Sequence, residues 1–86
     1  MITIKKINTV LQKIDFIATH SINKCSDIDE ISTLLSICYS GRVLLLQFKM
    51  TLVDGEDLPE LSSTAFKHVA DWTESKLEEF ENGDDK

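Results

Sequence analysis

The stretch that decides the fold runs from Asp27 to Val53 and reads DIDEISTLLSICYSGRVLLLQFKMTLV. Its second half, residues 43–53, is apolar at all but three positions. A helix or strand that is apolar on most sides must be covered on most sides. The whole chain has only 86 residues, so we expect part of this cover to come from a second copy or from another protein.

Two interpretations of this stretch differ at Ser40 and Gly41. A helix could end there and be followed by a strand at about 43–53, because apolar residues occupy every even position from 44 to 52. The chain would then be α+β. The alternative is one helix that continues through Gly41, at a cost of about 1 kcal/mol relative to Ala.

The polar residues of the stretch favour the single helix. At about 100° per residue, seven polar residues between positions 29 and 54 fall in one narrow window that contains no apolar residue. They are Asp29, Thr33, Ser36, Ser40, Gln47, Thr51 and Asp54. A helix followed by a strand would have no reason to keep this phase across Gly41. The sequence therefore predicts one helix from Asp27 to about Val53, roughly 40 Å long at 1.5 Å per residue.

A first amphipathic helix is predicted from about Thr3 to about His20, where apolar residues recur at three- and four-residue spacing. Ile2 and Ile4 alternate with polar residues, which also fits a short initial strand. Ser26 is the expected N-cap of the long helix.

A third helix is predicted after the turn at residues 54–57. Asp57 and Glu60 resemble a capping box, and Pro59 lies in the first turn, where a missing N–H does no harm. The helix should end near residue 81. Its expected apolar face comprises Leu58, Leu61, Ala65, Phe66, Val69, Ala70, Thr73, Leu77 and Phe80.

These elements predict an all-α, three-helix domain over residues 1–81, with a long, largely buried central helix and a frayed acidic tail at residues 82–86. Helices of roughly 17, 27 and 24 residues differ in length, so one end of the central helix would be bare in a monomer. We therefore expect a homodimer in which the central helices cross or run antiparallel, close at Gly41.

Charge is distributed unevenly. Residues 1–53 carry six basic and four acidic side chains, a net of +2, whereas residues 54–86 carry three basic and eleven acidic ones, a net of −8; together they give the total of −6. An acidic half repels phosphate, so direct nucleic-acid binding is not expected. A protein with a basic surface is the expected partner.

Catalytic and metal-binding motifs are absent from the sequence. The histidines and cysteines, His20, Cys25, Cys38 and His68, show none of the spacings of a metal site, and the three glycines are too far apart for a phosphate loop. We therefore predict no enzyme activity and no cofactor. No signal peptide or long unbroken apolar run is evident, so a cytoplasmic protein without a membrane partner is expected.

The predicted function is noncatalytic protein binding, as an adaptor or inhibitor. Tyr39 and Trp72 are candidate interface anchors because each has an apolar ring and a polar tip, and Arg42 lies within the apolar stretch. An acidic row at helical spacing on the third helix comprises Asp71, Glu74, Glu78 and Glu81. An alternative function follows from this row: imitation of nucleic-acid phosphates by a phage or plasmid protein that blocks a basic nucleic-acid-binding protein of host defence.

Overall fold

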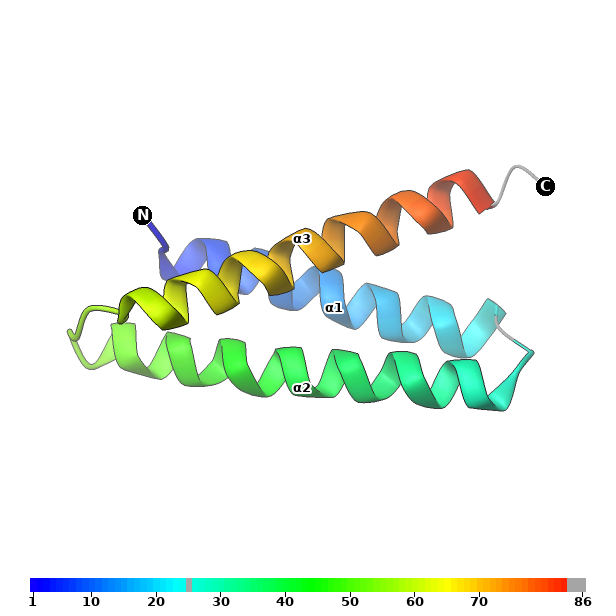
Figure 1. Cartoon of the computed structure of the whole chain (residues 1–86), viewed down its shortest axis with the longest axis horizontal. Coiled ribbons are helices and arrows are strands. Elements are labelled where there is room, and N and C mark those ends of the chain that lie inside the picture. Colours follow the sequence, from blue (N-terminus) through cyan, green and yellow to red (C-terminus); the bar gives the residue numbers. More distant parts are fainter. Residues whose placement is uncertain (25, 84–86) are drawn as a thin grey trace.

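Three helices make up the fold, α1 (Ile4–Lys24), α2 (Ile28–Val53) and α3 (Glu60–Gly83) (Figure 1). The structure is a computed structural model that describes residues 1–24 and 26–83. Helices are the only regular elements in this part of the chain, so the all-α prediction is confirmed. Because α2 continues through Ser40 and Gly41 without a break, the polar stripe gave the right interpretation and the alternative strand at 43–53 is wrong.

Both ends of α2 are capped by local hydrogen bonds. The N-cap is Asp27 rather than the predicted Ser26, because an Asp27 carboxylate oxygen accepts a hydrogen bond from the Asp29 N–H at 3.0 Å. At the other end Gly55 has a φ of +84°, a left-handed conformation that glycine adopts without strain.

The turn after α2 is a Schellman motif. The Gly55 N–H donates to the Leu52 carbonyl at 3.0 Å, and the Glu56 N–H donates to the Thr51 carbonyl at 3.1 Å. These bonds satisfy carbonyl groups that the end of a helix would otherwise leave unpaired. The two hydrogen bonds therefore account for the turn that was predicted at residues 54–57.

The ends of the other two helices differ from the prediction. α1 extends to Lys24, four residues past His20. α3 begins at Glu60 rather than Asp57: the Ser63 N–H donates to the Pro59 carbonyl, and the described residues show no capping hydrogen bond from the Asp57 side chain. α3 also includes residues 82 and 83, which were expected to fray, while the rest of the predicted tail lies outside the described residues.

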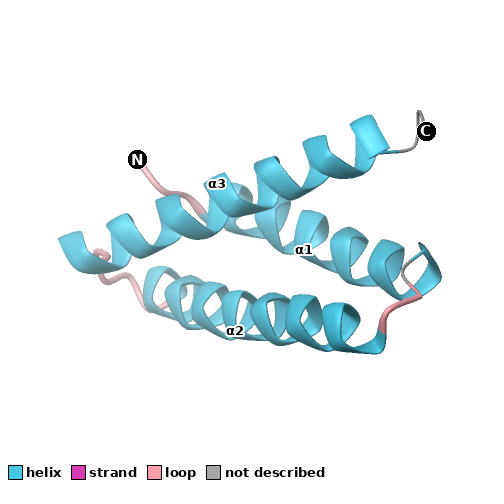
Figure 2. Cartoon of the chain, turned by 45° about the vertical axis from the view of Figure 1, so that its right-hand side comes forward, coloured by secondary structure: helices cyan, strands magenta, loops and turns pink. Residues whose placement is uncertain are grey.

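The best-covered helix is α1, which packs against both α2 and α3, whereas α2 and α3 touch only sparsely (Figure 1). In both overall views α3 diverges from α2 toward its C-terminal end (Figures 1 and 2). The buried apolar core comprises Ile7, Val10, Ile14 and Ile17 of α1, Cys38, Leu45 and Phe48 of α2, and Phe66 of α3.

α2 is long, as predicted, but it is less buried within one chain than predicted. Its buried residues form one stripe, made of Leu34, Cys38, Gly41, Leu45 and Phe48. Large apolar side chains on its other faces remain exposed. The physical reason is the divergence of α3, which leaves α1 as the main cover of α2.

Gly41 belongs to the buried stripe. A Cβ placed there would lie 3.4 Å from Val69 Cγ1 and 3.5 Å from Ile14 Cδ1. The helices that approach Gly41 are therefore α3 and α1 of the same chain. Gly41 therefore contacts helices of its own chain, and the predicted homodimer stays a prediction.

Candidate protein-binding groove

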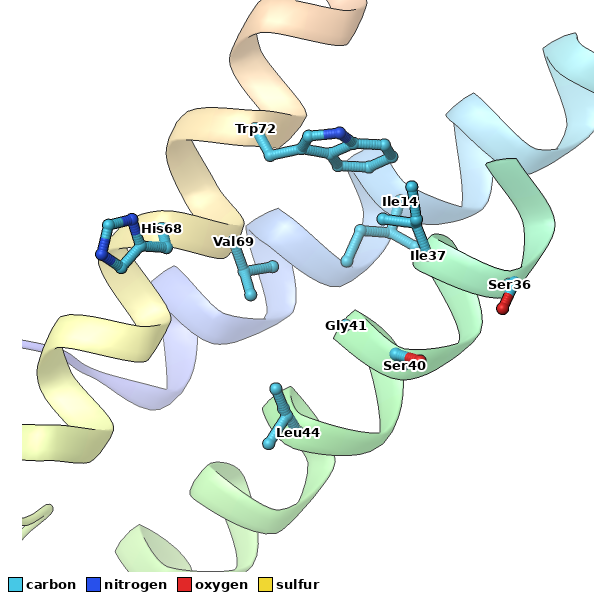
Figure 3. Close-up of a pocket in the computed structure, with 9 residues that line it drawn as sticks. All are labelled: Ile14, Ser36, Ile37, Ser40, Gly41, Leu44, His68, Val69 and Trp72. Carbon is cyan, nitrogen blue, oxygen red and sulfur yellow. The ribbon is translucent and has the colours of Figure 1, made fainter. Parts of the chain in front are cut away.

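An apolar groove of about 310 Å³ lies between α2 and α3 (Figure 3). Its apolar lining consists of Ile37, Gly41 and Leu44 of α2, Val69 and Trp72 of α3, and Ile14 of α1. The Trp72 ring projects from α3 across the groove toward Ile37 and Ile14, and Val69 points at Gly41 (Figure 3). Helix α1 therefore forms the floor, and the two diverging helices form the walls.

The groove is open because α3 is only partly embedded. Among the residues of its predicted apolar face, only Phe66 and Thr73 are buried, and Val69 is half-buried, as is the neighbouring Trp72. Leu61 was assigned to the same face but is 82% exposed. The apolar face of α3 is thus wider than the surface that α1 and α2 offer it.

Polar groups surround the apolar lining. Ser36 and Ser40 of α2 carry their hydroxyl groups away from the groove, and the His68 ring also points away from it (Figure 3). Beyond Ile37 the surface continues into a second depression that includes Asp27, Asp29 and Glu30 of the α2 end and Lys76 of α3, whose ammonium group pairs with Glu79. An apolar channel that ends beside a group of carboxylates suits an apolar ligand with a basic flank.

A second apolar surface lies on another side of α2, which we call the α2 strip. It consists of Tyr39, Val43, Leu46, Met50 and Val53, with exposed fractions of 70, 37, 41, 60 and 59%. The polar stripe that includes Ser36, Ser40 and Gln47 separates it from the groove. Monomeric proteins seldom leave such a continuous apolar row on one helix in water.

The predicted interface anchors do not lie together. Trp72 lines the groove, whereas Tyr39 belongs to the α2 strip. Arg42 lies beside that strip, where its Nη1 is 2.6 Å from Asp15 Oδ1 of α1. The carboxylate partner of Arg42 therefore comes from its own chain.

The predicted acidic row lies on the exposed side of α3. Asp71, Glu74, Glu78 and Glu81 are all exposed, but the Glu74 carboxylate forms an ion pair with the Lys13 ammonium group of α1. This ion pair and the Arg42–Asp15 pair attach α1 to each of its neighbours. The row is therefore not a continuous set of free carboxylates.

The histidines and cysteines do not form a reactive cluster among the described residues. The His20 ring stacks on Phe80 with centroids 4.2 Å apart and lies 5.9 Å from the Phe16 ring, as expected of a packing role. Cys38 is buried, and desolvation together with the nearby Asp15 raises its thiol pKa. Cys25 lies outside the described residues.

Helix α2 also has the length and composition of a helix that crosses a membrane. Between residues 31 and 53 its charged side chains are Arg42 and Lys49. The core helix of a soluble protein has the same properties, although only 28% of the most apolar 18-residue window is buried here. The cytoplasmic location and the absence of a membrane partner accordingly stay predictions.

Sequence reasoning identified Trp72 but missed the other residues of the groove. Val69 was assigned to the apolar face of the third helix, and Ile37 and Leu44 belong to the central helix that was predicted to be largely buried. Periodicity shows which side of a helix is apolar but does not show how far a neighbouring helix tilts away. The α2 strip did have a signal, because its members are four, three, four and three residues apart.

The fold and its surfaces define an all-α, three-helix protein with more apolar surface than one chain covers. Comparison with known protein families, with characterised proteins and with solved structures finds no match for the chain.

Proposed function

We propose that this chain is a noncatalytic binding protein, an adaptor or inhibitor, that holds an amphipathic helix of another protein in the groove between α2 and α3. The open apolar groove is the observation that supports the proposal. Water contacts Leu44 and Ile37, which are 38 and 42% exposed. A partner that covers them gains the free energy of apolar burial, about 25 cal/mol per Å².

The shape of the groove favours a helix as its occupant. Residues 37, 41 and 44 of α2 recur at four- and three-residue spacing, so their wall extends along the helix axis. A ligand helix laid between α2 and α3 would contact α1 beneath it and complete a four-helix arrangement. Recognition of this kind uses an apolar face of the ligand with anchors one turn apart.

Charge favours a basic partner. The chain has a net charge of −6, and Asp27, Asp29 and Glu30 lie at the end of the groove where α3 is farthest from α2. Carboxylates at this position would attract lysine or arginine residues at one end of the bound helix. The partner expected from sequence, a protein with a basic surface, fits this arrangement.

Mimicry of a nucleic acid, the alternative derived from sequence, has less support. Lys13 engages Glu74 in the middle of the acidic row, and Lys67 lies one turn before Asp71 on the same side of α3. One ammonium group in the row and one beside its first residue reduce the negative potential that imitation of phosphates requires.

Trp72 provides a direct test because it is the chain's one tryptophan and it lines the groove. We expect a synthetic amphipathic helix of leucine and lysine to bind saturably and to shift the Trp72 emission, and a leucine and glutamate peptide of the same pattern to bind much more weakly. Leu44→Lys should abolish binding, because it places a charge in the apolar lining.

Leu46→Lys is the matched control for this test. Leu46 has nearly the same exposure as Leu44, 41 against 38%, but lies on the α2 strip. The Leu46→Lys variant should therefore bind the basic peptide with the same affinity as the unmodified chain. Equal loss of binding in both variants, or peptide binding that leaves Trp72 emission unchanged, would contradict the proposal.

A further inference from the structure

We infer that the α2 strip is an interface between two copies of this chain, which pair as a parallel two-stranded coiled coil. This surface is separate from the groove of the proposed function. Its residues, Tyr39, Val43, Leu46, Met50 and Val53, follow the alternating spacing of the a and d positions of a heptad repeat over two heptads. A seam with this spacing on an exposed helix face is the surface that a second helix packs against.

The residue types at these positions suit two parallel strands. Val43 and Met50 occupy a positions, and Tyr39, Leu46 and Val53 occupy d positions; Val43 with Leu46 is the pair that has the preferred residue types. A β-branched residue at a with leucine at d favours a parallel dimer over higher oligomers. Each residue of the strip would then pack in a layer with the same residue of the second copy.

The charges beside the seam set the orientation. Arg42 and Lys49 occupy the flanking g positions, and Gln47 and Asp54 occupy the e positions. Parallel pairing brings g against e of the other copy, so Lys49 meets Asp54 of the second copy and Arg42 meets Gln47. Antiparallel pairing would bring the basic g positions together, and like charges disfavour it.

The exposed area of the chain fits an uncovered interface. One chain exposes 6080 Å², whereas a folded monomer of 9.7 kDa is expected to expose about 5,100 Å². The excess is on the order of the 800 Å² that each partner contributes to a standard protein interface. The radius of gyration of the chain is 14.0 Å, whereas a compact domain of this length has a radius of roughly 12 Å.

The other helices leave the strip accessible. The side of α2 that packs on α1 and α3 carries Leu34, Leu45 and Phe48, and the strip lies well away from it around the helix. Arg42, at the edge of the seam, already has the Asp15 carboxylate at 2.6 Å. A second copy would thus cover no unpaired charge at this position.

Sedimentation equilibrium of the full chain tests the interface. We expect a mass near twice 9.7 kDa at tens of micromolar, and a mass near 9.7 kDa for Leu46→Glu and for Met50→Glu. Both side chains are exposed in one chain, so circular dichroism should show unchanged helix content. Leu44 lies two residues from Leu46 but lines the groove. Leu44→Glu should therefore remain dimeric.

Charge reversal tests the orientation. Lys49→Glu should weaken a parallel dimer a few-fold by facing Asp54 of the second copy, and adding Asp54→Lys should restore the affinity. A monomeric mass for the unmodified chain, or no restoration in the double variant, overturns the inference. So does a monomeric chain that binds phospholipid vesicles through Leu46, which would make the strip a membrane contact instead.

Discussion

Val69 of α3 lies directly over the backbone of Gly41 in α2, where a Cβ would stand 3.4 Å from Val69 Cγ1. This is an ordinary van der Waals distance, so the site has room for a methyl group and little more. The contact lies at the bottom of the apolar groove and sets how closely α3 approaches α2.

Gly41→Ala should therefore stabilise the chain. Alanine removes the helix-interior cost of glycine, about 1 kcal/mol, and its methyl group fits against Val69. Gly41→Leu should instead cost about 1–3 kcal/mol, because the larger side chain must displace α3. Urea unfolding followed by circular dichroism measures both. If Gly41→Ala destabilised the chain, α3 would have to lie closer to Gly41 than the 3.4 Å contact with Val69 indicates.

Gly55→Ala should destabilise the chain, in contrast to Gly41→Ala. The φ of Gly55 is +84°, and a residue with a Cβ pays about 1–2 kcal/mol in the left-handed region. Open space surrounds Gly55 among the described residues, so backbone strain is the only cost. The same urea titration should show a lower midpoint with an unchanged slope, and equal stability of the variant would contradict the Schellman turn.

Ser21→Ala should stabilise the chain by about 1 kcal/mol. Ser21 is fully buried and its Oγ has no hydrogen-bond partner among the described residues, so the hydroxyl loses its hydration without compensation. Ser75→Ala, at an exposed position of α3, is the control for helix propensity alone. A gain at Ser21 no larger than that at Ser75 would mean that a water molecule or a neighbour satisfies the hydroxyl.

Cys38 should make stability fall at high pH. Burial and Asp15 raise the pKa of its thiol above the ordinary value of 9.0, so above pH 9 the unfolded chain loses this proton before the folded chain does. Stability is therefore full below pH 9.0 and declines as the pH rises from there toward the folded-state pKa. Cys38→Ala should show a smaller decline in thermal melts between pH 8 and 10.5, and identical slopes would rule out this effect.

The helices could be predicted from sequence because each has its own periodic signal. The polar stripe through Ser40 and Gln47 established α2 as one helix, against the competing alternation of residues 43–53. The predicted capping residues were wrong. The N-cap of α2 is Asp27 rather than Ser26, and α3 does not begin at Asp57. A cap depends on the conformation of one or two residues, and several neighbouring side chains could have served.

The site could be predicted only in part. Trp72 was selected for its amphipathic ring and lines the groove, whereas Tyr39, selected for the same reason, lies on the α2 strip. Sequence periodicity orients each helix about its own axis and carries little information on the tilt between helices. The groove arises from the divergence of α3, so Ile37 and Leu44 could not be separated from the core in advance.

Binding of a basic amphipathic helix in the groove can be measured through Trp72. The titration compares the unmodified chain with Leu44→Lys and Leu46→Lys, two leucines of nearly equal exposure on different sides of α2. We predict saturable binding with a shift in Trp72 emission for the unmodified chain and Leu46→Lys, and no binding for Leu44→Lys. Binding to Leu44→Lys with unreduced affinity would contradict the assignment of the groove as the binding site.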